Sequence, residues 1–363
     1  MSDTERAWLI LGRAHLRGDH LAALLREHGS APAVVAARPA SLPERYREAI
    51  VHPDERAIEK DLEWLHEPSH HFVHPESADY PELLARIPDP PTLLYIAGDR
   101  DVLHLPSLAI VGSRNPTRGG IQNAFEFARY LGRHGFCIVS GLASGIDTAA
   151  HEGALAAGAK TVAVLGHGID RVYPAANREL AHRIVSQGAL ISEYALGSPP
   201  SREHFPQRNR LISGLTLGAL VVEAARRSGS LITARVASEQ GREVFAIPGS
   251  IHNTLSRGCH RLIREGAKLV ESAEDIVAEL GPLTAHLMQN STPAIEHAAA
   301  AVHDAEYDTL LDLIGFDPVS ADELARQSGL TIGQVSSMLL ILELEGRIEA
   351  QTGGRYSRLG NSD

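Results

Sequence analysis

The chain has 363 residues, enough for two or three domains, and 44% of them are hydrophobic and 22% charged, as is ordinary for a globular protein. The formal net charge of −11 argues against indiscriminate binding to polyanions, so a nucleic-acid site would have to come from local basic loops. Two scattered cysteines, Cys137 and Cys259, give neither a disulfide framework nor a metal-ligand pattern. We therefore expect a reducing compartment, no bound metal and no cofactor.

The N-terminus carries no pattern of a signal peptide, and no apolar run approaches the roughly 20 residues that span a bilayer. We expect a cytoplasmic protein with no membrane partner. Residues 1–75 are predicted to form a small helical domain, because Leu21, Leu24 and Leu25 recur at helical spacing and Gly29 and Pro32 interrupt the run. Gly18 would suit a helix–hairpin–helix turn that contacts DNA, but we favour a plain connection between helices.

Residues 76–282 change character, because short runs rich in Val, Ile and Leu alternate there with helical stretches. Such runs are typical of strands buried on both faces, and the alternation predicts an α/β fold with a doubly wound, Rossmann-like parallel sheet. Ligands of such sheets bind beyond the carboxyl ends of the strands. The predicted strands are Leu108–Val111, Phe136–Val139, Thr161–Leu165, Ala189–Ser192, Leu217–Val222 and Glu243–Ile247.

Residues 283–304 are predicted to be a linker, and residues 305–363 a winged helix. A first helix is expected over Asp304–Ile314. Capping boxes at Ser320 and Thr331 open the second and third helices, and the glycines of residues 346–356 indicate a hairpin wing. The third helix has no lysine or arginine between residues 331 and 345, so we favour packing or protein contact over reading of the major groove.

The loop after the first strand contains Gly112, Ser113 and Arg114, which offer a close backbone approach, a hydroxyl and a planar fork of donors for phosphate. It is no dinucleotide fingerprint. The loop could be an anion-binding site or an ordinary strand–helix turn with a surface arginine, and both interpretations stay open.

The loop after the second strand contains Gly141, Ser144 and Gly145 before a helix, whose backbone N–H groups could face an anion. Ser144 or Asp147 could equally be only the cap of that helix. Asp147 and His151 lie four residues apart, and we favour an intrahelical hydrogen bond over a catalytic triad, because no nucleophile elbow is present.

The stretch from Phe205 to Arg210 is the sharpest local signal. Arg208 and Arg210 offer guanidinium groups for phosphate, Asn209 an amide for a base edge and Phe205 a ring for stacking. The alternative is a solvated helix start with surface arginines.

The loop after the fifth strand places Gly229 and Ser230 at a third anion-friendly helix start. Glu223 at that strand end could be a general base, but we favour pairing with a nearby arginine that orders the loops. With no metal-ligand spacing, Walker loop or paired carboxylates, these loops are suited to binding phosphates rather than to an enzyme reaction.

Taken in order, these blocks resemble the DNA-processing protein A family (DprA, also called Smf). The blocks that carry the resemblance are Asp79–Leu84, Pro90–Gly98, Ala109–Arg114, Ser140–Asp147, Ala163–Gly168, Tyr173–Pro174, Ser192–Tyr194, Phe205–Arg210, Gly229–Ala234, Ile247–Gly249 and Leu262–Ala267.

The resemblance implies a sterile-α-motif-like N-terminal domain, an extended Rossmann core that forms a homodimer, and a C-terminal winged helix. It implies binding and protection of incoming single-stranded DNA in natural transformation, with loading of RecA recombinase. Carried over by motif, Arg114, Arg208 and Arg210 would contact phosphate, Gly141 would let the backbone approach DNA, and Asn209 and Phe205 would support the same pocket. Some members have asparagine where this chain has His260, which blurs that loop's role.

Three hypotheses follow. The first is single-stranded DNA binding by the core, with Ser113, Gly229 and Ser230 among its contacts. The second is a Rossmann-type nucleotide-processing enzyme that uses Glu223 or Asp147 as a base. The third is a duplex-DNA-binding regulator that acts through the winged helix. The sequence gives neither the surface that contacts RecA nor the geometry of a dimer.

Overall fold

The computed structural model describes residues 3–16, 18–38, 42–290, 310, 313–314, 319–344, 348–351 and 355–358. The chain divides into two compact units, Met1–Met288 and Gln289–Asp363, which we describe separately. The domain boundaries placed at residues 75 and 282 stay predictions. Most of the expected linker and of the helix expected over Asp304–Ile314 lies outside the described residues.

The first unit begins with five short helices. Their buried residues share one hydrophobic cluster with one face of the central sheet, to which Tyr95 and Leu190 contribute. Asp61 joins the two parts, because its Oδ2 accepts hydrogen bonds from Arg13 Nε at 2.6 Å and from the Tyr95 hydroxyl at 3.0 Å. The helices are α1 (Asp3–Arg13), α2 (Gly18–His28), α3 (Ala31–Ala37), α4 (Glu44–Val51) and α5 (Glu55–Trp64).

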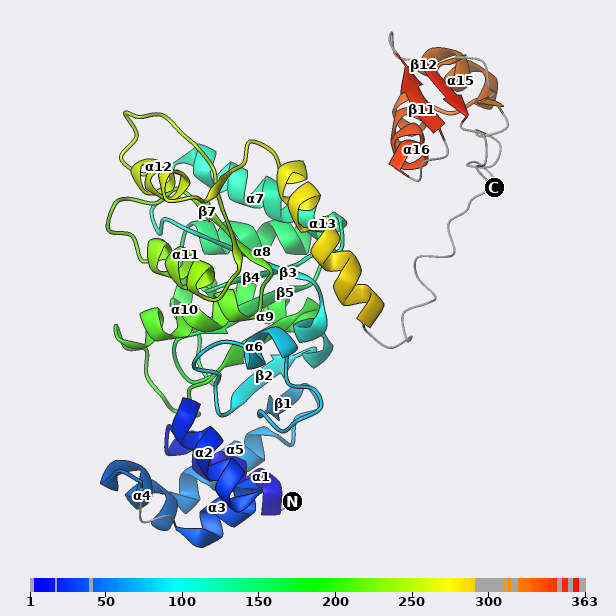
Figure 1. The fold of residues 1–363 in the computed structure, drawn as a ribbon. Helices are drawn as coiled ribbons and strands as arrows, with labels where there is room; N and C mark the ends of the chain where they lie inside the picture. The colour runs from blue at the N-terminus through cyan, green and yellow to red at the C-terminus, as the bar shows by residue number, and fades with distance from the viewer. Residues whose placement is uncertain are drawn as a thin grey trace. The chain divides into compact units, whose positions relative to one another are not determined.

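A nine-stranded sheet in the order β1-β2-β6-β5-β4-β3-β7-β8-β9 forms the centre of the first unit (Figure 1). The strands listed from β6 through β5, β4, β3, β7 and β8 to β9 run parallel to one another. Strand β2 pairs antiparallel with β6, and β1 pairs antiparallel with β2. The strands are β1 (His70–Val73), β2 (Leu94–Gly98), β3 (Ser107–Gly112), β4 (Cys137–Ser140), β5 (Thr161–Leu165), β6 (Ala189–Ser192), β7 (Gly218–Val222), β8 (Glu243–Ala246) and β9 (Lys268–Leu269).

Alternate residues of the central strands pack on opposite faces of the sheet. In β3, Leu108 and Ile110 join the cluster beneath α7, α8 and α13, whereas Ala109 and Val111 join the cluster beneath α10, α11 and α12. This arrangement is the expected doubly wound sheet, with strand order reversing at β3. The helices are α6 (Glu82–Ala85), α7 (Arg118–Arg133), α8 (Ile146–Ala156), α9 (Arg178–Gln187), α10 (His204–Gly214), α11 (Ser230–Glu239), α12 (Arg257–Arg264) and α13 (Ala273–Asn290), with 3₁₀ turns η1 (Arg100–His104) and η2 (Ala175–Asn177).

The second unit has the winged-helix pattern. The expected capping box at Thr331 forms, since Thr331 and Gln334 hydrogen-bond reciprocally. At Ser320 only the N-cap bond forms, from the backbone N–H of Glu323 to Ser320 Oγ, because the Glu323 carboxylate binds Arg326 and Gln327 instead. The wing is the antiparallel pair β11–β12, with β10 on its other edge. The elements are β10 (Val319–Ser320), α15 (Ala321–Ser328), α16 (Ile332–Leu344), β11 (Ile348–Gln351) and β12 (Arg355–Arg358).

None of the helices in the described ranges is both long and apolar enough to cross a membrane.

Candidate nucleic-acid interface

A pocket of about 700 Å³ lies at the carboxyl edge of the sheet, where loops after five parallel strands meet. This is the position that the topology of a doubly wound sheet reserves for a ligand. We call it the strand-end pocket; its lining is Val111, Gly112, Ser113, Arg114, Ala143, Asp147, Tyr173, Arg202, Phe205, Pro206, Arg208, Asn209, Ile212, Ala225, Ser228, Gly229, Ser230, Ile232 and Thr233.

Arg114 is the exposed cation at the end of the central strand β3. Its guanidinium carbon lies 5.6 Å from the centroid of the Phe205 ring, and that ring lies 5.9 Å from the ring of Tyr173. The three side chains come from the loop after β3, the first turn of α10 and the loop after β5, and they form a row of one cation and two aromatic rings. Such a row can attract a phosphate and offer stacking surfaces to planar rings.

Arg208 also lines the strand-end pocket, but it is only 4% exposed. Its Nη1 donates to the carbonyl oxygen of Gly141 at 2.9 Å and to that of Val164, so the side chain ties the ends of β4 and β5 together. Burial lowers the pKa of Arg208 to about 10, against the opposing pull of the Asp147 carboxylate. Arg208, which we expected to contact phosphate, is therefore mostly buried and mainly supports the loops that form the pocket.

Gly141 is buried and does not belong to the pocket lining. A Cβ atom at this position would lie 2.6 Å from Nη2 of Arg208, closer than atoms approach one another. The structure thus gives a different reason for this glycine from the one we expected. Its missing side chain makes room for the Arg208 guanidinium rather than for a ligand.

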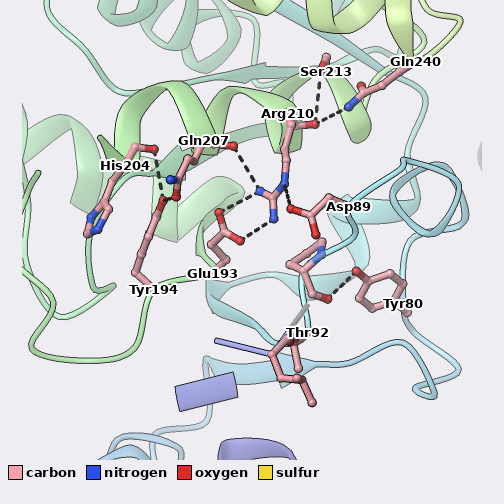
Figure 2. A network of polar contacts seen from close by, with 12 residues as sticks. Tyr80, Asp89, Thr92, Glu193, Tyr194, His204, Gln207, Arg210, Ser213 and Gln240 are labelled. Atoms are coloured by element: carbon pink, nitrogen blue, oxygen red, sulfur yellow. Dashed lines mark hydrogen bonds and ion pairs between the residues drawn. The ribbon is translucent and has the colours of Figure 1, made fainter. Parts of the chain in front are cut away.

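Arg210 does not line the strand-end pocket, and its guanidinium lies between Glu193 and Asp89 in the network of Figure 2. Its Nη1 and Nη2 bind both carboxylate oxygens of Glu193, at 2.8 and 2.7 Å, and its Nε lies 3.2 Å from Asp89 Oδ2. The side chain is 13% exposed and that of Glu193 3%. Because this forked ion pair occupies the guanidinium of Arg210, it weighs against the predicted phosphate contact. We infer a structural role for this residue.

The start of α8 differs from both expected caps. Its N-cap is Gly145, with φ +87°, and the Asp147 carboxylate instead accepts the backbone N–H groups of Gly141 and Ala143, at 3.1 and 3.3 Å. His151 Nδ1 bonds to the hydroxyl of Thr161 at 2.7 Å, so the expected bond between Asp147 and His151 does not form. Asp147 holds the β4 loop closed by binding its backbone.

Gly229 and Ser230 also line the strand-end pocket, at the start of α11, where Gly229 is the N-cap. Gly229 is exposed with no atom near the place of a Cβ, whereas Ser230 is buried and its hydroxyl lies 2.7 Å from that of Ser228. The amide of Asn209 reaches the Gly229 carbonyl at 3.5 Å. The expected anion-friendly helix start therefore lies beside Asn209 in the same pocket.

Glu223 orders loops, as we favoured, but without an arginine. It has a left-handed φ of +53°, and its carboxylate accepts from the backbone N–H and hydroxyl of Thr117, at 2.8 and 2.6 Å, and from Asn253 at 3.4 Å. It does not line the strand-end pocket. His260, the departure from the resemblance, bonds through Nε2 to the backbone of Gly249.

Among the lining residues that sequence reasoning missed, Tyr173 and Arg202 have the side chains best suited to contact a ligand. Tyr173 is 50% exposed and pairs with Phe205, and Arg202 is an exposed cation that precedes α10. Both lie in long connections in which we singled out no phosphate-binding residue from the sequence. The only signal for Tyr173 was its place within a block of the family resemblance.

The chemistry of the strand-end pocket is that of a binding site for an anion that carries planar rings. Three arginines stand against one aspartate in its lining, in a chain with a formal charge of −11. The serine hydroxyls and the exposed N-terminus of α11 add donors that suit phosphate oxygens. Within the described part of the chain, no three His, Cys, Asp or Glu side chains gather as a metal site would require.

Two family models and several known proteins match this chain. Residues 71–281 match the family model described as DNA recombination-mediator protein A, and residues 294–354 match that of the DprA winged helix domain. A relative from Escherichia coli, Protein Smf, is 42% identical over 309 residues, covering 84% of this chain and 81% of that protein.

Two solved structures are also similar. The X-ray structure of DNA processing protein A from Streptococcus pneumoniae aligns with a TM-score of 0.68 and 38% identity, over 77% of this chain and 98% of that one. DNA processing protein A from Helicobacter pylori, whose structure is described as revealing a unique single-stranded DNA binding mode, aligns with a TM-score of 0.54 and 30% identity, over 59% of this chain and 96% of that one.

Proposed function

Because this chain belongs to the DNA recombination-mediator protein A family, DprA/Smf, we propose that it binds single-stranded DNA in the strand-end pocket. The single-stranded DNA binding described for the Helicobacter pylori relative supports the proposal. The observation that carries it is the row formed by Arg114, Phe205 and Tyr173, at the strand edge where this fold receives ligands. One exposed cation and two ring faces match a phosphate followed by unpaired bases.

Arg114→Ala tests the proposal directly. We expect weaker binding of a single-stranded oligonucleotide and a salt dependence shallower by about 0.7 in log affinity against log salt, because one phosphate contact is lost. Folding should change little, since the side chain is exposed and forms no salt bridge within the described chain. Fluorescence anisotropy at several salt concentrations measures both quantities.

Arg118→Ala is the matched control, because Arg118 is an exposed arginine four residues further on that does not line the pocket. If both variants bind as the unaltered protein does, the pocket is not the DNA site. A duplex of the same sequence serves as competitor, and tighter binding of the duplex than of the single strand would favour the regulator hypothesis instead.

Tyr173→Ala should lower affinity about ten-fold with an unchanged salt slope. Stacking of one base on an aromatic ring contributes about 1–3 kcal/mol, and no charge is removed. Tyr173→Phe keeps the ring face and should bind almost as the unaltered protein does. Equal losses in the two variants would mean that the hydroxyl, not the ring, makes the contact, and the stacking role would be wrong.

We further propose a binding rather than a catalytic role. Glu223 lies outside the strand-end pocket and is engaged by Thr117 and Asn253, and Asp147 is 8% exposed and holds two backbone N–H groups. These engagements suit loop ordering better than proton transfer. Incubation with nucleoside phosphates provides the check, and turnover that disappears in Glu223→Ala would favour the enzyme hypothesis.

The family resemblance supports the remaining parts of the proposal. We propose that the protein acts as a homodimer in the cytoplasm, protects incoming single strands during natural transformation and helps to load RecA onto them. A RecA filament-assembly assay on strands coated with single-strand-binding protein tests the loading step. Faster assembly with the unaltered protein than with Arg114→Ala is the expected result.

A further inference from the structure

A second basic pocket of about 510 Å³ adjoins the strand-end pocket on the other side of α11. Ser228 and Ile232 line both pockets, so the two adjoin at the start of that helix. We call it the helix-side pocket. Its lining is Arg226, Arg227, Ser228, Leu231, Ile232, Ala234, Arg235, Ser238, Arg242, Glu243, Val244, Arg261, Leu262, Glu265, Gly266 and Ala267.

Charge sets this surface apart from the rest of the chain. Five arginines stand against two glutamates in the lining, whereas the whole chain carries a formal charge of −11. A concentration of one sign in a concave surface raises the local potential and attracts a polyanion. None of these five arginines lines the strand-end pocket, so their positive charge indicates a separate binding role for the helix-side pocket.

The arginines of the helix-side pocket are available to a ligand to different degrees. Arg226 and Arg227 are exposed, and no carboxylate within the described chain is paired with either. Arg261 pairs with Glu265 at 2.8 Å and Arg235 with Glu239 at 3.7 Å, but all four side chains are more than half exposed, so these pairs are weak and a phosphate can replace them.

Arg242 is the lining arginine that is held most firmly by the protein. Its Nη2 donates to the backbone carbonyls of Leu83 and Gly214, at 2.8 and 3.4 Å, and its buried Nε has no hydrogen-bond partner. Burial lowers the pKa of Arg242. A cation held in place with an unsatisfied donor stabilises negative charge brought close to it.

Because the two pockets adjoin and both are basic, we infer that the helix-side pocket is a second subsite for the same DNA strand. The inference rests on the proposed function. A single strand that leaves the strand-end pocket passes Ser228 and Ile232, its phosphates meet Arg226, Arg227 and Arg261, and its sugars and bases pack on the aliphatic wall of Leu231 and Leu262. The protein therefore holds a longer strand than one pocket accommodates.

The test compares oligothymidylates of about 4 to about 20 nucleotides, a range that covers the site sizes of single-strand grooves. The variant Arg226→Ala/Arg227→Ala/Arg261→Ala should bind the longest strand at least about ten-fold more weakly, with a salt slope shallower by up to about 2, because each lost phosphate contact contributes about 0.7. Its affinity for the shortest strand should change less than about two-fold. Arg114→Ala should weaken binding at every length.

The control is Arg133→Ala/Arg257→Ala/Arg264→Ala, which removes the same charge from exposed arginines outside both pockets. Equal losses in the two triple variants would show a general field effect and overturn the inference. So would a first triple variant that matches the unaltered protein at every length, as expected if the surface serves an acidic protein partner. No single-strand binding by the unaltered protein would instead sink the proposed function itself.

Discussion

Arg210→Ala should destabilise the first unit by about 3–5 kcal/mol, although its charge and position made it a predicted DNA contact. Removing this guanidinium leaves the carboxylate of Glu193, whose side chain is 3% exposed, buried without its forked cation. Asp89 and the carbonyl of Gln207 lose the same partner. The free energy of unfolding in urea measures the effect, with far-ultraviolet circular dichroism as the probe.

Two further variants separate the ion pair from the loss of volume. Arg210→Met/Glu193→Leu replaces the pair by apolar side chains of similar size and should recover most of the stability, because no charge is left buried. Arg86→Ala breaks an ion pair to Glu82 in which both side chains are about two-thirds exposed, and it should cost less than about 1 kcal/mol.

DNA binding distinguishes the two roles of Arg210. For the folded fraction of Arg210→Ala we expect an unchanged salt slope, because the side chain lies outside the strand-end pocket. A stable variant whose slope is shallower by about 0.7 would instead restore the phosphate contact that the sequence predicted.

The central sheet was predictable because buried parallel strands leave a strong composition signal. All six expected runs are strands, from β3 to β8, within about a residue of the expected ends. Three strands of this sheet were missed: the interior strand β2, although it is apolar and fully buried, and the two edge strands β1 and β9. β1 begins with the polar His70 and His71, and β9 is only two residues long, so neither forms an apolar run.

The gathering of loops into one pocket was also predictable, because the carboxyl ends of parallel strands share one edge. The direction of each side chain was not. Arg208 and Arg210 are two residues apart on α10, and only 4% of Arg208 and 13% of the Arg210 side chain is exposed. Their carbonyl and carboxylate partners come from other loops, so an arginine-rich stretch could not reveal which cations stay available.

Arg208→Ala is expected to cost about as much stability as Arg210→Ala, for a different reason. It leaves the carbonyl oxygens of Gly141 and Val164 without their donor and removes the strongest favourable charge acting on buried Asp147. Burial already raises the pKa of Asp147, so its carboxylate depends on such support. We expect a loss of about 3–5 kcal/mol in urea unfolding. Arg118→Ala, at an exposed arginine, should change stability by less than about 0.5 kcal/mol.

Gly141 makes the role of Arg208 testable by a double-mutant cycle. Gly141→Ala alone should be strongly destabilising, because its Cβ would lie within 2.6–2.8 Å of three guanidinium atoms held by backbone carbonyls. In the Arg208→Ala background that space is empty, and the same substitution should cost about 1–3 kcal/mol less. Additive costs would mean that Arg208 moves aside easily. An arginine that moved so easily could turn to a phosphate, and the salt slope of Arg208→Ala would then fall as far as that of Arg114→Ala.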